Sequence, residues 1–163
     1  MILELEGPDF LGEVGCFEVR PFLCYRFGMM PDAVKMKLAV QKLAEENGLS
    51  LVLLFGSRAT GKTHKESDVD IGYLPEQPLS IKDEIHLNYE LTLIFGTDHV
   101  DTVNLRHASA LLLREITDQA VVLFEKTGTE LDTFAIYALR RFREASPLFE
   151  IRREKLDAFL KPV

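Results

Sequence analysis

The feature that most constrains the fold is a continuous apolar run, Ser50 to Phe55, followed by a polar segment and an alternating run, Asp68 to Leu74. A continuous apolar run of this length is typical of a strand buried on both faces. Strict alternation of polar and apolar residues predicts a second strand, which prolines end. The polar segment between them, Gly56 to Ser67, is predicted to be a loop. The two runs therefore indicate two strands joined by a polar loop.

Helical patterns surround these strands. A helix is predicted to begin at Pro31 and to end at Gly48 in a left-handed cap. A second begins at a capping box, Ser80 with Asp83. Its apolar residues fall on one stripe, Ile81, Ile85, Tyr89 and Leu93.

The rest of the chain continues the alternation, so the predicted class is α/β (α+β), a small mixed sheet flanked by helices. The further predicted elements are a strand over His99–Leu105, a helix over Ser109–Ile116, a strand over Ala120–Phe124, and two helices over Glu130–Ala145 and Leu148–Leu160 that Pro147 divides.

Composition excludes several classes of protein. A chain of 163 residues that is 47% hydrophobic can bury one core, so we expect one catalytic domain. A net charge of -7 weighs against direct binding to a nucleic-acid backbone. The longest apolar run is too short to span a membrane, and the first ten residues lack the basic start of a signal peptide. We therefore expect a cytoplasmic protein without a membrane partner.

The loop after the first strand satisfies two motifs. Gly56 to Thr63 fits the GxxxxGK[ST] pattern of phosphate-binding P-loops. Gly56-Ser57, ten residues and Asp68-Val-Asp70 resemble the signature of polymerase beta-like nucleotidyltransferases. A P-loop needs a helix of several turns after its Lys-Thr, whereas here an alternating strand follows almost at once. The second interpretation is therefore favoured, and a P-loop NTPase is less favoured.

The second motif has a physical meaning. Side chains two residues apart on a strand point to the same face, so Asp68 and Asp70 can reach one metal ion. Magnesium takes oxygen ligands from one or two carboxylates and from substrate phosphates. Gly56 lets backbone amides approach a triphosphate, and the Ser57 hydroxyl can donate to a phosphate oxygen.

A third carboxylate completes the predicted metal site. Asp101 lies in the strand over 99–105, which a sheet of this order would place beside the Asp68–Asp70 strand. Asp98 is the alternative, although its place after Gly96 indicates the turn before that strand. Converging acids raise one another's pKa, so a cation is expected to belong to the site.

Beyond the first motif, the stretch Val100 to Glu125 resembles the strand, helix and final strand of the minimal nucleotidyltransferases, the antitoxin partners of HEPN ribonuclease toxins. The resemblance covers roughly Pro31 to Leu160, and it implies a polymerase beta-like nucleotidyltransferase fold with C-terminal helices. It also implies a minimal nucleotidyltransferase domain over residues 30–163. Residues 1–29 form an N-terminal extension that the resemblance does not explain.

The resemblance implies an enzyme that uses ATP and Mg²⁺ to transfer AMP to a hydroxyl, expected to be a tyrosine, of a cognate HEPN toxin. Such a protein is the antitoxin of a type VII toxin–antitoxin pair. Asp68 and Asp70 would hold the metal, and Asp101 would bind a second metal or activate the hydroxyl. Two alternatives remain open: transfer to a small molecule such as an aminoglycoside, and a non-catalytic module that only binds the toxin.

Overall fold

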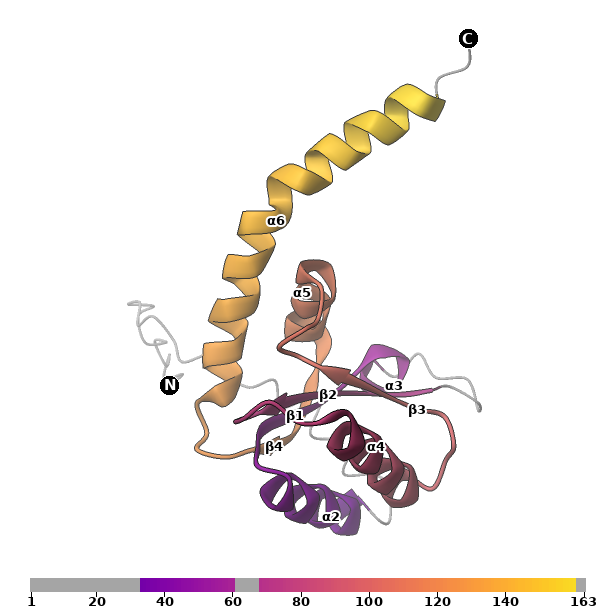
Figure 1. The fold of residues 1–163 in the computed structure, drawn as a ribbon, viewed down its shortest axis with the longest axis vertical. Coiled ribbons are helices and arrows are strands. Elements are labelled where there is room, and N and C mark those ends of the chain that lie inside the picture. Colours follow the sequence, from indigo (N-terminus) through magenta and orange to yellow (C-terminus); the bar gives the residue numbers. More distant parts are fainter. Residues whose placement is uncertain (1–32, 61–67, 161–163) are drawn as a thin grey trace, which may run out of the picture.

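The computed structural model describes residues 33–60 and 68–160 (Figure 1), so residues 1–29 and the start predicted at Pro31 lie outside the described part. Strands and helices alternate along the chain, as predicted for the α/β class. The elements are α2 (Ala33–Glu46), β1 (Leu49–Phe55), α3 (Gly56–Thr60), β2 (Val69–Pro75), α4 (Ile81–Phe95), β3 (Val100–Asn104), α5 (Ala110–Gln119), β4 (Val121–Glu125) and α6 (Glu130–Leu160).

The four strands form one mixed sheet in the order β3-β2-β1-β4. β1 lies in the middle, antiparallel to both β2 and β4, and β2 pairs with β3 in parallel. Every residue of β1 except Ser50 is buried, which confirms the prediction of a strand covered on both faces. Successive β1 side chains pack alternately into two separate hydrophobic cores.

Each core fills one side of the sheet. On one side, α2 and α4 cover Leu49, Val52 and Leu54; on the other, α5 and the first half of α6 cover Leu51 and Leu53 (Figure 1). The molecule is therefore a three-layer arrangement, with helices on both faces of a small sheet.

The predicted ends of α4 are confirmed. The Ser80 hydroxyl accepts from the Asp83 N–H while the Asp83 carboxylate accepts from the Ser80 N–H, which completes the capping box. Gly96 ends the helix in the left-handed conformation, with φ +64°. Gly48 has φ +59° after α2, as predicted for its cap.

Two sequence predictions are wrong. The segment predicted as a loop begins with the short helix α3, because Gly56, with φ +71°, turns the chain out of β1 and the next residues wind into a helical turn.

The apolar stripe predicted for α4 lies on the outer face of the helix. Its four residues, Ile81, Ile85, Tyr89 and Leu93, are all exposed.

The second wrong prediction concerns the tail. α6 is continuous over 31 residues with Pro147 inside it, not two helices divided there. Proline removes one backbone donor and crowds the preceding turn, which bends a helix without always ending it. Figure 1 shows α6 bending along its length and projecting away from the sheet. Among the described helices, none is both long enough and apolar enough to cross a membrane.

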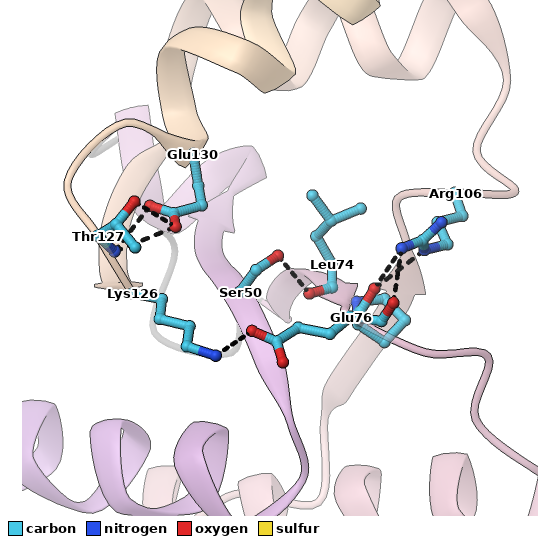
Figure 2. A network of polar contacts seen from close by, with 8 residues as sticks. Ser50, Leu74, Glu76, Arg106, Lys126, Thr127 and Glu130 are labelled. Atoms are coloured by element: carbon cyan, nitrogen blue, oxygen red, sulfur yellow. Dashed lines mark hydrogen bonds and ion pairs between the residues drawn. The ribbon is translucent and has the colours of Figure 1, made fainter.

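Polar contacts hold the end of β2 that carries Pro75 (Figure 2). The Arg106 guanidinium donates to the Pro75 carbonyl from Nε and Nη2, at 3.0 and 2.8 Å, and from Nη2 to the Glu76 carbonyl at 3.1 Å. The Glu76 carboxylate pairs with the Lys126 ammonium. Ser50 donates to the Leu74 carbonyl at 3.1 Å. These contacts join the ends of β1, β2, β3 and β4.

Candidate functional site

The sheet register brings two of the predicted acids side by side. In the parallel pairing of β2 with β3, Asp70 lies opposite Asp101. Asp68 stands one residue before β2, where the Val69 N–H donates to the His99 carbonyl at 2.9 Å and ties the two segments together. All three acids therefore lie at the end of the sheet where β2 and β3 begin.

The pKa of Asp70 is raised by the other acids of this site. Burial raises the pKa of the half-buried Asp70 carboxyl, and the neighbouring charges of Asp101, Asp68 and Glu115 raise that pKa further. Each of these charges penalises a second negative charge nearby. The three predicted acids thus form one electrostatic cluster.

Glu115 is a member of this cluster that the sequence prediction missed. It lies on α5, an amphipathic helix, where an exposed acid has no motif around it to signal a role. Only the packing of α5 on the sheet brings its charge near Asp70. Asp98 lies in the turn before β3, as predicted, and is not among the charges that raise the pKa of Asp70.

Gly56 is in direct contact with the cluster. A Cβ atom built at this position would lie 2.1 Å from Oδ2 of Asp70, closer than any real side-chain contact. The Asp70 carboxylate therefore packs on the bare backbone of Gly56, which also needs glycine for its φ of +71°. Ser57 follows, half-buried in α3. The predicted Gly-Ser turn thus abuts the predicted acids.

The donor set fits a hard cation. Carboxylate oxygens that repel one another are stabilised by Mg²⁺, which takes one or two of them and completes its shell with water and phosphate. Among the described residues, no three His, Cys, Asp or Glu side chains are already arranged to hold a metal ion. A nucleotide that brings its own phosphate oxygens supplies the remaining ligands.

Two grooves of the described surface lie away from the acid cluster. A groove of about 650 Å³ runs along α6, and one of about 580 Å³ lies between α2 and β4. Neither is lined by Asp68, Asp70 or Asp101.

Comparison with known proteins agrees with this geometry. Residues 39–129 match the model of the family "Polymerase beta, Nucleotidyltransferase". The chain is 28% identical to the protein adenylyltransferase MntA of Aphanizomenon flos-aquae, covering 77% of this chain and 89% of that protein. It is 33% identical to the protein adenylyltransferase MntA of Shewanella oneidensis, covering 63% of this chain and 73% of that protein.

Solved structures are similar over the same region. A crystal structure of a toxin–antitoxin with AMP-PNP matches with a TM-score of 0.63 and 28% identity, covering 77% of this chain and 98% of that one. A tri-AMPylated Shewanella oneidensis HEPN toxin in complex with MNT antitoxin matches with a TM-score of 0.60 and 25% identity, covering 78% and 98%. The chain belongs to the polymerase beta nucleotidyltransferase family, and within it to the minimal nucleotidyltransferases of the MntA type.

Proposed function

We propose that this protein transfers AMP from ATP to a hydroxyl group of a cognate HEPN-type toxin and so acts as its antitoxin. The observation that carries the proposal is the pairing of Asp70 with Asp101 beside Asp68, next to the Gly56 turn. Similarity to the MntA proteins over most of their length, and to an antitoxin structure with AMP-PNP, supports ATP as the nucleotide. The reaction is placed in the cytoplasm, where its substrate ATP is abundant.

The acids divide the chemical work. Asp68 and Asp70 would hold Mg²⁺, which when bound neutralises phosphate charge and orients the nucleotide. Asp101 faces Asp70 across the strand pair and is exposed, so it can accept a proton from an incoming hydroxyl or hold a second cation. The Gly56 backbone and the Ser57 hydroxyl are assigned to the phosphates.

The transfer itself is an in-line displacement. The acceptor oxygen forms a bond to the α-phosphorus of ATP, and the bond from that phosphorus to the bridging oxygen breaks. Pyrophosphate leaves with the electron pair, and the hydroxyl proton passes to Asp101 or to water. The tyrosine acceptor is the one that the family resemblance implies.

Similarity to toxin–antitoxin complexes, one of them with an AMPylated HEPN toxin, favours a protein acceptor over a small molecule. A small acceptor such as an aminoglycoside is expected to need a concave pocket, and neither groove described above is lined by the acids. The domain assigned to this reaction spans residues 30–163, with residues 1–29 outside it. A module that only binds the toxin would not need the cluster of repelling acids.

Labelling of the toxin tests the proposal. The full chain, a HEPN-type toxin from the same organism and ATP labelled at the α-phosphate should give labelled toxin with Mg²⁺, and none with EDTA. The double variant Asp68→Asn with Asp70→Asn should abolish labelling. Asp132→Asn, at an exposed aspartate on α6, is the matched control and should label normally.

Two outcomes would overturn the proposal. Labelling by the double variant at the normal rate would remove the acids from catalysis. Label found only on small molecules, with none on the toxin, would show the aminoglycoside-type activity instead.

A further inference from the structure

The outer face of α4 carries an apolar stripe that the fold does not use. Ile81, Ile85, Tyr89 and Leu93 are exposed by 77%, 66%, 57% and 58%. Residues spaced by four advance only about 40° around a helix, so the four side chains form one continuous row. A contiguous apolar row on a surface helix indicates an interaction site, whereas apolar residues scattered singly over a surface do not.

The inner face of α4 already supplies its packing. Leu87 and Leu91 are buried in the core between α4 and the sheet. Glu84 accepts from the Tyr73 hydroxyl, and Asn88 donates to the Val100 carbonyl at 3.1 Å, so the polar residues of that side are tied to β2 and β3. The outward stripe is therefore surplus to the stability of this domain.

The stripe can pair with the same stripe of a second copy. If the second α4 lies antiparallel, with the two-fold axis at the level of residue 87 along the helix, Ile81 meets Leu93 of the second copy and Ile85 meets its Tyr89. Every apolar residue of the row then has an apolar partner, and the same contacts occur twice, as an isologous interface requires.

The charges beside the stripe specify the same arrangement. Lys82 and Glu90 lie on one flank of the row, two four-residue steps apart. Antiparallel pairing places Lys82 beside Glu90 of the second copy, and the symmetry makes this contact twice.

We propose that α4 is a self-association surface on which a second copy of this chain docks antiparallel. The surface is separate from the acidic cluster, so the proposal does not depend on the reaction that the acids perform. Two such stripes with their flanks bury on the order of 800–1,000 Å² in total, below the usual size of a stable interface. The dimer is therefore weak and forms at high protein concentration.

Sedimentation equilibrium of the full chain, from about 1 µM to about 500 µM, tests the stripe. The wild type is expected to pass from monomer to dimer over this range. Ile85→Asp places two charges in the seam and is expected to weaken dimerisation at least about a hundredfold. Ile136→Asp, at a residue of the same type that is 70% exposed on α6, is the control and should dimerise normally.

Charge reversal tests the antiparallel register. Lys82→Glu and Glu90→Lys each place like charges together twice and are expected to weaken dimerisation about fivefold. The double variant restores opposite charges and should dimerise as the wild type does. Circular dichroism checks that each variant remains folded.

Four outcomes would overturn the proposal. The first is a wild type that stays monomeric at 500 µM, and the second is equal weakening of dimerisation by the Ile136 control and the Ile85 variant. The third is a double reversal that leaves the dimer as weak as the single reversals do. The fourth is loss of toxin binding by the α4 variants with the self-association constant unchanged.

Discussion

The two ends of β2 treat charge in opposite ways. Where β2 begins, Asp70 is half-buried among Asp101, Asp68 and Glu115, and these like charges raise its pKa. Where β2 ends, the Glu76 carboxylate pairs with Lys126, and Arg106 donates to the Pro75 and Glu76 carbonyls (Figure 2). At the first end, acidic groups repel one another; at the second end, each of these polar groups has a partner of opposite charge or a hydrogen bond. If the proposed function is correct, the acids at the first end serve the reaction and the paired groups at the second end serve the fold.

The turn into α6 resembles the satisfied end. Burial alone would raise the pKa of Glu130, but hydrogen bonds from the Thr127 hydroxyl and from backbone N–H groups of the turn lower it to about 2. Here each carboxylate oxygen accepts from donors of the protein itself. At the start of β2, Nδ1 of His99 lies 3.7 Å from Oδ1 of Asp68, but the charges around Asp70 are those of other acids, so we expect a bound cation to offset them.

The largest effect is expected from Asp70→Asn. Removing this metal-holding carboxylate should lower AMP transfer to the toxin about a thousandfold or more, measured as labelled toxin per minute. The same change should stabilise the protein without ligands. A carboxyl with a raised pKa favours folding below its ordinary pKa, and that contribution is lost as pH rises through the raised value.

At neutral pH the ionised Asp70 therefore opposes folding, and asparagine relieves the repulsion. After allowance for solvent screening, the melting temperature should rise by roughly 1–3 °C. A variant that is both inactive and less stable would contradict the distinction between the two ends, because Asp70 would then contribute to the fold as Glu76 does.

Gly56→Ala should have the next largest effect. A methyl group there would collide with the Asp70 carboxylate and strain a backbone with φ +71°, so transfer should fall about a hundredfold. Gly96→Ala is the matched control, because it has φ +64° but nothing within 4 Å of the added carbon. It should cost about 1 kcal/mol of unfolding free energy and leave the transfer rate unchanged. Equal loss of activity in both variants would show general strain instead.

Arg106→Ala probes the opposite end of the sheet. It leaves the Pro75 and Glu76 carbonyls without these donors, so the free energy of unfolding should fall by about 1–2 kcal/mol. AMP transfer below the melting temperature should stay within about twofold of the wild-type rate. Urea denaturation and the labelling assay measure the two quantities, and a large loss of transfer without a loss of stability would break the division of roles.

Glu130→Gln should have the smallest effect. A carboxyl whose pKa is lowered stabilises the fold above its ordinary value, and this contribution is lost as pH falls from about 4.5 to about 2. The wild type should therefore lose stability in that window more steeply than the variant. At pH 7 the variant should be less stable by only about 0.5 kcal/mol, since the residue is only partly buried and solvent screens its charge. Thermal melts at several pH values measure this difference. Parallel curves of melting temperature against pH for the wild type and the variant would contradict this role of Glu130.

Patterns that depend on neighbours in sequence predicted much of this molecule. Burial of the β1 run, the capping box of Ser80 and the glycine after α4 follow from local chemistry, and each is confirmed. The position of Asp101 on a strand beside Asp70 is also as expected, because a helix crossover returns the chain to the neighbouring strand. The catalytic roles of these acids remain predictions.

What failed depends on tertiary contacts. The stripe at helical spacing left open which face of α4 meets the sheet, and in the structure Leu87 and Leu91 face it while the row at Ile85 is exposed. Glu115 joins the acids only through the packing of α5. Pro147 was expected to divide two helices, but α6 continues through it. The proline alone does not show whether the turns on either side are stable enough to keep the helix continuous.

Calorimetric titration of the full chain with Mg²⁺ and a non-hydrolysable ATP analogue tests most directly whether the acids form the nucleotide and metal site. Binding by Asp70→Asn and Asp101→Asn should be at least about tenfold weaker than binding by the wild type. Asp98→Asn should bind as the wild type does. Equal affinity in the wild type and in the Asp70 and Asp101 variants would contradict the assignment.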